Sequence, residues 1–532
     1  MQGYSHLMRS RWLLLSIWIC FLLRGWFYAS LFPLWEGYDE FAHFGVVRAM
    51  ATKGLLLVPR QQAGPRDVEE SLALAPIPWE VRSWEVLRSS LTEDAYWKLP
   101  PEERQAREAR LRNLPLAWAR EDSTHGISAY EALQPPLAYW LMAPVLYALR
   151  GAGLLAQVIW LRWIGVAIAS LAIPLTFRIA LAVARSEAAA LGCSAVVALM
   201  PGFAINAARV SNEPLAILLF SLLVWLGIGV LNRPPDVRSA AALGAVLGLG
   251  LLTKAYFLAA LPPVFLLLLY KWRKAWAPLV TALSVAAAIA GWWYVRNLVI
   301  TGTLTGLAEP VMLRGRGMTA ELAAVPHVPW LHAVDAILVS HLYFCGWSSL
   351  TVRSWIYHFF YAIVLLAALG LIAQLRRGAV VWLPDVYAFF WLGQFYNVVL
   401  QYLTKGLAAS MGWYLYAVVA SEVPLTAAAF GRWSTWAASL GAVLFGALDL
   451  YGMHWLAIPY YTGLIAHRAN GALAAMHVSQ VRAIGVSALF ERMAVNKPLS
   501  SHLLIVLWIL YLAGTIAPMF AALLSAARGE KR

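Results

Sequence analysis

The stretch QPPLAYWLMAPVLYALR, residues 134–150, decides how this chain of 532 residues is laid out. It opens with a proline pair, contains Pro144, and offers only about 15 apolar residues, whereas a helix that spans a bilayer needs about 20. A stretch this short suits a surface-lying or re-entrant helix as well as a crossing. Whether it crosses decides which side of a membrane every later segment faces.

The composition is that of a polytopic membrane protein. Hydrophobic residues make up 61% of the chain and charged residues 13%, and the mean hydropathy is +0.66. The first apolar segment is followed by Trp35 and Glu36 rather than by a small-residue cleavage site, so we expect a retained anchor helix. Further segments are also apolar enough to consider as crossings. Together these are 12–34, 135–149, 160–184, 188–206, 214–231, 239–253, 255–270, 276–296, 355–375, 380–401, 411–430, 434–452 and 502–526.

Basic residues in the loops choose between two topologies. Arg9 and Arg11 precede the first segment, which places the N-terminus inside. If 135–149 does not cross, the other short basic loops also fall inside, and if it does cross, all of them turn outside. The first arrangement obeys the positive-inside bias, so we predict twelve crossings with both termini cytoplasmic. The loops concerned lie at Arg185, 232–238, 270–274, 374–377, Arg432 and 528–532.

This topology places segment 35–134 outside the cytoplasm as one large loop. It holds 16 of the 27 acidic residues and 12 of the 41 basic ones, which gives it a net charge of −4. Because the whole chain has a net charge of +14, the remaining residues together carry +18. That excess is spread over short loops, and no folded basic domain is left to bind nucleic acid. Cys20 and Cys193 lie in apolar segments and only Cys345 lies in a loop, which predicts no disulfide framework.

Five regions follow from the predicted topology. They are an anchor helix, 1–34; an extracytoplasmic loop with interfacial helices, 35–159; a transmembrane core, 160–300; a second extracytoplasmic loop, 301–354; and a C-terminal transmembrane module, 355–532, with its own loop at 453–501. Within the first loop we expect a helix at 38–52 and charged amphipathic stretches at 79–90 and 101–112. Polar residues far apart in sequence would meet at this face, above apolar crevices. Such an arrangement suggests an active site for an amphiphilic substrate.

The motif YDEFAHF, residues 38–44, supplies the first candidate site residues. On a helix, Asp39 and His43 are four positions apart and Glu40 and His43 three apart, so one face presents all three. They can serve as a carboxylate base with a supporting acid and an imidazole, or only as favourable acidic residues at a helix start. Together with Glu213 they would suit Mg²⁺ or Mn²⁺, so a divalent metal is an alternative.

Asn212 and Glu213 stand at the outer start of a crossing, in the motif SNEPLA at 211–216. Glu213 can point into the site. Ser211 or Asn212 can equally cap the helix, because proline suits the first helical turn that follows. The sequence leaves both interpretations open.

Two cations flank the same face. Lys254 lies at the outer turn between two short apolar halves, and Arg296 ends a crossing in the motif GWWYVRN. Each can meet an anionic group at the membrane surface, or can merely anchor its helix at the interface, as Trp292 and Trp293 would. Weaker candidates of the same kind are Arg48, Lys53 and Arg60. The chain has no P-loop, Rossmann glycine pattern, zinc-spaced Cys/His set or G-x-S-x-G elbow, so a phosphate-bearing donor would have to come from the membrane itself.

Six motifs carry a family resemblance, in one order along roughly residues 10–430. They are YDEFAHF (38–44), QPPLAYW (134–140), SNEPLA (211–216), LLTKAYF (251–257), GWWYVRN (291–297) and FCGWSSL (344–350). In this order they resemble the bacterial DUF2142 membrane-protein family, which is similar to the GT-C glycosyltransferases, including protein mannosyltransferases and the aminoarabinose transferase of lipid A. The resemblance implies an all-α polytopic protein of the bacterial plasma (inner) membrane. Its fold would be a GT-C-like bundle of about 12 transmembrane helices with a large first extracytoplasmic loop.

The resemblance also implies an activity. Such an enzyme transfers a hexose or pentose from a polyprenyl-phosphate donor to a hydroxyl of a glycan, lipid or protein acceptor, with inversion and without an obligatory metal cofactor. Asp39 matches the catalytic aspartate, Glu40 the acid beside it, and His43 would assist them. Lys254 and Arg296 match positions suited to the carrier phosphate. Supporting roles fall to Asn212, Glu213, Gln134, Trp292 and Trp293.

Two departures from the family pattern concern aromatic residues. Tyr38 stands where the family usually has proline before the Asp-Glu pair. The segment MGWYLYA, 411–417, resembles a family pattern GRYLLPA, but Trp413 stands where an arginine is expected. If that arginine holds phosphate in the family, another cation must do so here.

Two other classes of protein stay open as alternatives. A secondary transporter or lipid flippase would suit twelve crossings and the broken pair at 239–270, although the sequence has no internal repeat. The ionisable residues inside predicted crossings are isolated, namely Arg24, Arg162 and Arg178. A non-catalytic scaffold for polysaccharide assembly is the third interpretation.

Overall fold

The computed structural model describes residues 2–54, 56, 63–84, 87, 90–115, 128–232, 234, 236–272, 276–375 and 382–529. Within these ranges the protein is built from helices, and the only bridges between extended segments are four isolated ones. The all-α prediction is confirmed for this part of the chain. Arg60 and parts of the basic loops at 232–238, 270–274, 374–377 and 528–532 lie outside the described residues.

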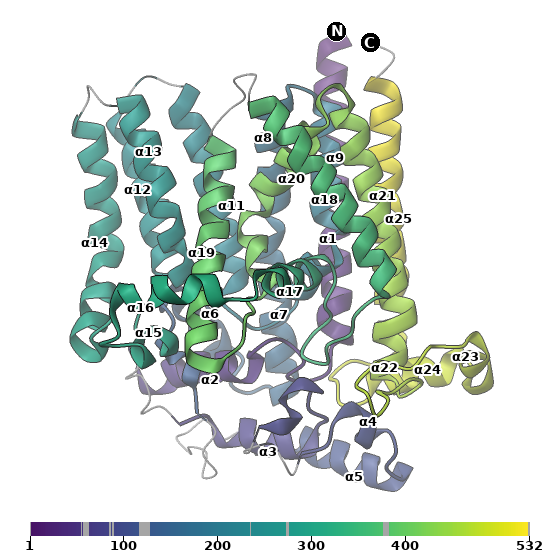
Figure 1. Cartoon of the computed structure of the whole chain (residues 1–532). Coiled ribbons are helices and arrows are strands. Elements are labelled where there is room, and N and C mark those ends of the chain that lie inside the picture. The colour runs from purple at the N-terminus through teal and green to yellow at the C-terminus, as the bar shows by residue number, and fades with distance from the viewer. Residues whose placement is uncertain are drawn as a thin grey trace.

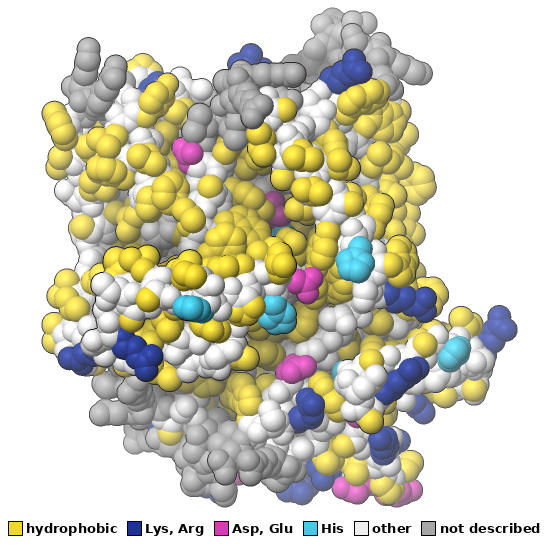
Figure 2. Space-filling view, viewed as in Figure 1, with side chains coloured by type: hydrophobic (Ala, Val, Ile, Leu, Met, Phe, Trp, Pro, Cys, Tyr) yellow, Lys and Arg dark blue, Asp and Glu magenta, His cyan; other side chains and the backbone are white. Residues whose placement is uncertain are grey.

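In the described part of the chain, seven helices are long and apolar enough to cross a membrane, and each coincides with a predicted crossing. They come from α1 (Gln2–Leu31), α7 (Leu154–Ser170) continued by α8 (Ala172–Ala184), α11 (Glu213–Asn232), α14 (Trp276–Thr301), α18 (Ser354–Leu375), α21 (Ser434–Gly452) continued to Tyr461, and α25 (Ser501–Gly529). Large apolar side chains on their outer faces are exposed, for example Val299 at 79% and Phe520 at 61%. Surfaces of this kind fit helices that are surrounded by lipid, and Figure 2 shows that hydrophobic side chains cover most of the visible flank.

The other predicted crossings are broken or short. The pair α9 (Glu187–Leu199) and α10 (Pro201–Ala207) is bent by 58°. The shorter helices are α12 (Val237–Leu251), η4 (Ala255–Ala260) with α13 (Leu261–Trp272), and η6 (Gly412–Val418) with α20 (Val419–Ala429); α19 (Trp382–Lys405) is long but more polar. The structure therefore supports a helical membrane protein with several crossings, and the number twelve stays a prediction.

The proline-rich stretch that opened the sequence forms α6 (Leu137–Ala148). Twelve residues rise about 18 Å, well short of the roughly 30 Å hydrocarbon core. The Leu137 amide donates to the Leu252 carbonyl at 2.9 Å, and the Trp140 ring stacks on Trp292 at 6.0 Å between centroids. As a single helix, α6 is too short to span, and it lies against the ends of α12 and α14.

Segment 301–354, expected as a loop, contains helices of its own. They are α15 (Ala308–Met312), α16 (Gly317–Ala324) continued by η5 (Val325–His327), and α17 (Trp330–Leu342). The stretch from Gly317 to His327 meets α17 at 88°, as in a broken span or a re-entrant loop. The break follows from Pro326 and Pro329, which lack the amide needed to continue a helix.

The two ends of the molecule differ. Figure 1 shows the start of α1 and the end of α25 together at one end, and the short helices of the first loop at the other. The described helices of that loop are α2 (Glu40–Lys53), α3 (Arg66–Leu74), η1 (Glu80–Ser83), α4 (Glu93–Tyr96), α5 (Pro101–Arg112) and η3 (Tyr130–Leu133), and beside them lie α22 (Ile458–Tyr461), α23 (Val478–Ile484) and α24 (Val486–Ala494). The helix predicted at 38–52 corresponds to α2, Glu40–Lys53. Of the two stretches predicted as charged and amphipathic, 101–112 forms α5, and the described part of 79–90 contains the short η1. We call this half the loop end of the molecule.

Buried polar contacts fasten the loop end to the bundle. The Glu36 carboxylate accepts from the Ser348 amide at 2.8 Å and from its hydroxyl at 2.9 Å, which ties the start of the first loop to FCGWSSL. Deeper in the bundle, Arg24 of α1 pairs with Asp449 of α21 at 2.7 Å, and both side chains are fully buried. Because burying a lone charge costs several kcal/mol, these partners hold their helices together.

Candidate active site

Asp39 stands where the first loop enters α2. Its backbone is left-handed, with φ 55° and ψ 19°, and its side chain caps no helix amide. The carboxylate turns toward η3 instead, where Oδ1 accepts the Tyr130 hydroxyl proton at 2.6 Å. Asp39 therefore stands at the N-cap position of α2, and Glu40 follows in its first turn, but the Asp39 side chain satisfies none of the helix amides.

The surroundings of Asp39 combine burial with positive charge. Burial raises the pKa of the Asp39 carboxyl above its ordinary value. The hydrogen bond from Tyr130 opposes that rise, and so do the charges of the nearby cations. These cations are Arg209, Lys254 and Lys405. A buried carboxylate under the influence of cations from three different segments is a common arrangement at catalytic sites.

Glu40 is committed to an ion pair. Its carboxylate binds the Arg162 guanidinium of α7 through two contacts, 2.7 Å to Nε and 2.5 Å to Nη2, and it also accepts the Val210 amide at 2.9 Å. Arg162 in turn donates to carbonyls at the end of α1. Glu40 thus fixes the entry of α2 against α1 and α7, and Arg162 is not an isolated membrane arginine.

His43 lies one turn further along α2. Its Nδ1 is 2.8 Å from the Tyr139 hydroxyl of α6 and 3.7 Å from Oε2 of Glu131. Burial lowers the pKa of His43 well below its ordinary value, and the charges of Lys254 and Arg209 lower it further. The imidazole is therefore neutral at pH 7.

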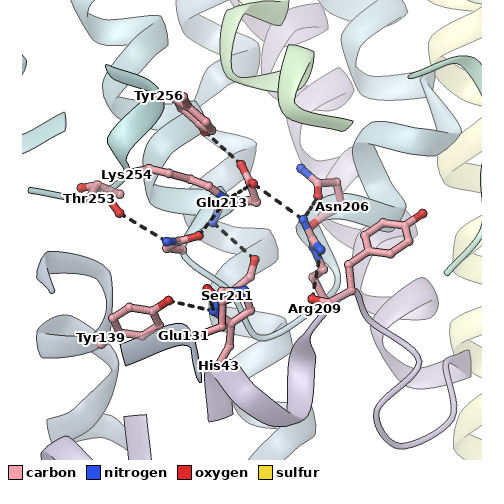
Figure 3. A network of polar contacts seen from close by, with 12 residues as sticks. His43, Glu131, Tyr139, Asn206, Arg209, Ser211, Glu213, Thr253, Lys254 and Tyr256 are labelled. Carbon is pink, nitrogen blue, oxygen red and sulfur yellow. Dashed lines mark hydrogen bonds and ion pairs between the residues drawn. The ribbon is translucent and has the colours of Figure 1, made fainter. Parts of the chain in front are cut away.

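Lys254 and Glu213 form the centre of a buried network at the start of α11 (Figure 3). The Lys254 ammonium contacts the Glu213 carboxylate and donates to Asn212 Oδ1 at 3.1 Å, and Glu213 Oε2 accepts the Tyr256 hydroxyl proton at 2.9 Å. Ser211 Oγ accepts the Glu213 amide at 3.3 Å, so Ser211 does the local capping. Asn212 and Glu213 both point into the network, as the functional interpretation expected.

Arg209, which the sequence analysis did not single out, completes this network. Its guanidinium is 3.9 Å from Glu213, donates to the Tyr38 carbonyl at 3.1 Å and also contacts Asn206. It lies 4.7 Å from the centroid of the Tyr38 ring, which stacks on Trp413 at 3.7 Å and 10°. The two aromatic departures from the family pattern therefore pack against each other, under an arginine supplied by another segment. Arg209 lies in the non-helical segment just before α11, and no local pattern in the sequence pointed to it.

Glu131 and Gln134 bring η3 and the residues after it into the same cluster. Burial, and next the charge of Asp39, raise the pKa of Glu131 to about 8. Glu131 Oε2 and Gln134 Oε1 are buried without a hydrogen-bond partner. Figure 3 shows Glu131, His43 and Tyr139 beside Ser211, close to Glu213 and Lys254. Gln134 was expected here, whereas Glu131 was not nominated from the sequence.

Arg296, Trp292 and Trp293 occupy a different place on α14. Trp292 stacks on Trp140 of α6, and the Arg296 guanidinium lies 4.9 Å from the Trp293 ring centroid. Arg296 is partly exposed and also contacts Asn297. The weaker candidate Arg48 binds Asp67 at 3.0 Å and Gln157 at 2.8 Å, inside the loop end.

A metal centre fits these side chains poorly. Of the proposed ligands, Glu40 is occupied by Arg162 and Glu213 by Lys254. In the described ranges, no group of three or more His, Cys, Asp or Glu side chains is arranged to hold a metal ion. We therefore assign no step of a reaction to a metal.

Comparisons with known proteins leave the family open. No family model matches the sequence. No curated protein matches it either. Among solved structures, the chain is similar to the crystal structure of ArnT from Cupriavidus metallidurans bound to undecaprenyl phosphate, at 15% identity and a TM-score of 0.38. The match covers 74% of this chain and 65% of that protein, and at this level it carries no argument about activity.

Proposed function

We propose that this chain is a membrane glycosyltransferase that moves a hexose or pentose from a polyprenyl-phosphate donor to an acceptor hydroxyl at the loop end of the molecule. The observation that carries the proposal is the buried Asp39 carboxylate, set among cations from separate segments at the ends of apolar helices. An amphiphile whose charged group lies at the membrane surface matches both features.

Segments that are distant in sequence meet at this place. Asp39 belongs to YDEFAHF, Glu213 to SNEPLA and Lys254 to LLTKAYF, and all three lie in or beside one network. Ser348 of FCGWSSL donates to Glu36, three residues before Asp39. Trp413 of MGWYLYA stacks on Tyr38, the residue directly before Asp39. The convergence supports the proposed function because motifs that only packed helices together would have no reason to share one polar site.

The chemistry assigned to these residues is a single displacement. The acceptor oxygen attacks the anomeric carbon, the bond from that carbon to the phosphate oxygen breaks, and the phosphate leaves with the electron pair. Asp39, as the ionised base, takes the proton from the acceptor hydroxyl. Arg209, Lys254 and Lys405 stabilise the charge that grows on the departing phosphate. Attack opposite the leaving group inverts the anomeric configuration.

The apolar part of the donor needs a separate place. Figure 2 shows a hollow near the middle of the visible face, lined mainly by hydrophobic side chains. It lies just above the position of α17 in Figure 1, which has the same view. A polyprenyl chain is a branched hydrocarbon, so lipid-facing and crevice surfaces of this kind suit it. Both termini would be cytoplasmic and the loop end extracytoplasmic, in the bacterial plasma membrane.

The test uses purified protein in liposomes. Polyprenyl-phosphate glucose and polyprenyl-phosphate arabinose are supplied in turn, and release of the sugar to an added glycan or to water is followed. We expect turnover with one of these donors and none with a free nucleotide sugar. Transfer from a nucleotide sugar, or movement of the lipid across the bilayer without release of sugar, would instead support one of the alternative classes.

A further inference from the structure

A second carboxyl group lies beside Asp39. Tyr130 and Glu131 are neighbours on η3, and the Tyr130 hydroxyl donates to Asp39 at 2.6 Å. Glu131 reaches His43 of the same helix that Asp39 opens, with Oε2 at 3.7 Å from Nδ1. The two carboxyl groups therefore belong to one buried cluster, in which adjacent residues of η3 contact α2: Tyr130 contacts Asp39, and Glu131 lies near His43.

The two carboxyl groups differ in what their oxygens receive. Asp39 accepts a hydrogen bond, which stabilises its ionised form. The Glu131 carboxyl receives a hydrogen bond from the Gln134 side chain, but its Oε2 is buried and accepts none, and His43 Nδ1 at 3.7 Å is too far to supply one. The geometry thus favours the negative charge on Asp39 and a proton on Glu131. The pKa of Glu131, raised to about 8 by burial and by the charge of Asp39, agrees with that distribution.

The balance of charge around the site supports the same assignment. Glu40 is paired with Arg162, Glu213 with Lys254, and Glu309 with Lys405 at 2.9 Å. Glu213 also lies 3.9 Å from Arg209, which acts on Asp39 as well, so with Asp39 ionised these four cations and four carboxylates balance. An ionised Glu131 would leave the cluster with a surplus negative charge at a site proposed to receive an anionic phosphate. A protonated Glu131 avoids that repulsion.

Titratable and charged groups of several elements act on Glu131 or on its neighbours. Those that act on Glu131 are Asp39 and His43 of α2, Tyr130 of η3, Tyr139 of α6, Arg209 before α11, Lys254 before η4 and Tyr414 of η6. Glu213 acts on Tyr139, and Lys405 at the end of α19 acts on Asp39. The tyrosines stay neutral near pH 7, and burial raises the pKa of Tyr130 and Tyr139 further above that range. His43 is neutral as well. No protonated histidine is therefore available to compensate a second negative charge.

Two further buried polar atoms in this region have no partner. Gln134 Oε1 lies three residues after Glu131, and Asn206 Nδ2 belongs to the side chain that contacts Arg209. A buried polar atom without a partner costs free energy unless a ligand or water satisfies it. One protonated carboxyl, one amide oxygen and one amide nitrogen offer both donors and acceptors, which is what the hydroxyl groups of an uncharged sugar need.

We propose that Glu131 is the second carboxyl group of this site, that it stays protonated while Asp39 is ionised, and that its hydroxyl donates a hydrogen bond to a hydroxyl of the transferred sugar. The assignment rests on the proposed function for the identity of that ligand. The ionisation state of Glu131 does not depend on it. An uncharged sugar therefore fits the site, whereas a uronic acid would meet two carboxyl groups.

The ionisation is tested without substrate. Infrared spectra of the purified wild-type protein and of Glu131→Gln are recorded through a pH titration, and the carbonyl stretch of a protonated carboxylic acid is followed. We expect a band at pH 7 that disappears near pH 8 in the wild type and is missing from the variant. A difference spectrum that shows only a carboxylate at pH 7 would overturn the proposal, whether or not the protein transfers sugar.

The role in the reaction is tested by kinetics. Glutamine keeps a neutral donor at position 131, so Glu131→Gln should retain transfer within about threefold at pH 7, whereas Glu131→Ala should lose about tenfold or more. Because Glu131 is neutral while Asp39 ionises, Glu131→Gln should leave the acid limb of the pH–rate profile in place and should remove the fall in rate near pH 8 at which Glu131 gains its charge. Glu70→Gln, in an exposed pair on α3, is the matched control and should leave the profile unchanged.

Each kinetic outcome is informative. Loss of transfer in Glu131→Gln would show that a negative charge is required, and wild-type behaviour of Glu131→Ala would show that the side chain is not used. Either result overturns the proposal. If the wild-type protein itself transfers no sugar from the polyprenyl-phosphate donors, the proposed function fails, and the infrared result still decides the ionisation of Glu131.

Discussion

Asp39 is held by its backbone as well as by its carboxylate. The left-handed conformation at φ 55° is one that aspartate and asparagine adopt more readily than most residues. The Asp39 carbonyl accepts the His43 amide at 2.9 Å, which starts α2, while the side chain is left free to meet Tyr130. The structural and the chemical roles of this residue can therefore be separated by one substitution.

We expect Asp39→Asn to fold normally and to lose transfer. Asparagine tolerates the same backbone and its Oδ1 can still accept from Tyr130, but it takes no proton from an acceptor hydroxyl. The loss of a general base typically costs about 10²–10⁴ in rate. Turnover of the donor by the purified variant measures the effect, and its thermal unfolding serves as the control. Wild-type turnover would remove Asp39 from the reaction.

Lys254 needs a paired substitution, because its partner is buried with it. Lys254→Met alone removes the closer counter-charge of the fully buried Glu213 and leaves it only Arg209 at 3.9 Å; breaking a buried ion pair typically costs about 3–5 kcal/mol of stability. Adding Glu213→Gln removes the stranded charge, so we expect the double variant to recover most of that stability. Transfer should stay low in both variants if the ammonium meets the phosphate. Recovery of transfer together with stability would reduce Lys254 to a structural role.

A site residue was predictable where an ionisable side chain stood within a short motif at the end of an apolar segment. Asp39, His43, Glu213 and Lys254 all lie in the cluster that their motifs suggested. Arg209 was not predicted, because an arginine next to an apolar segment is usually an anchor, and its contacts with Tyr38 span 171 residues. Glu131 lies in a loop rich in charges of both signs, where only the fold shows which carboxyl is buried.

At the scale of elements, the entry to α2 is packed without spare room. A Cβ at Gly37 would lie 2.6 Å from Cβ of Arg209 and 3.2 Å from Cβ of Glu40. The chain here passes between the start of α2 and the segment before α11. Only glycine, which has no side chain, allows this approach. The backbone at Gly37 therefore packs directly against the Arg209 side chain and brings the start of α2 close to the segment before α11.

We therefore expect Gly37→Ala to move α2 away from Arg209. The displacement should lower both stability and transfer, by about 1–3 kcal/mol in unfolding free energy, as for other overpacked sites. Gly229→Ala on α11 is the control, because no atom lies within 4 Å of its Cβ and alanine favours a helix interior. Thermal unfolding and donor turnover of both variants provide the measurement. Equal behaviour of the two would contradict the close packing at Gly37.

Long apolar helices were the most predictable elements and broken ones the least. Seven predicted crossings correspond to the seven long helices because composition and length alone define such spans. The bent pair at 317–342 was expected as loop, since its prolines and polar residues mask its apolar character in the sequence. Where α6 lies depends on its contacts with Leu252 and Trp292, which the sequence does not show.

For the whole molecule, the position of the site shows that α11 and α12 run in opposite directions between the loop end and the other end. The start of α11 and the end of α12 meet at the network of Glu213 and Lys254, so the turn between these helices lies about 30 Å away, one length of α11. The start of α1 and the end of α25 lie at the end opposite the short loop helices (Figure 1). The positive-inside bias would then place the termini and the turn between α11 and α12 in the cytoplasm, and the loop end outside.

Cysteine labelling tests this arrangement. Single cysteines replace Arg110 and Asn470, which are exposed at the loop end, and Arg238, which is exposed next to the turn between α11 and α12; the three native cysteines are first replaced. A membrane-impermeant maleimide should label the first two positions in intact cells. Position 238 should react only after the membrane is opened, because it faces the cytoplasm. Labelling at position 238 in intact cells would reverse the orientation and, with it, the side on which Asp39 meets its substrate.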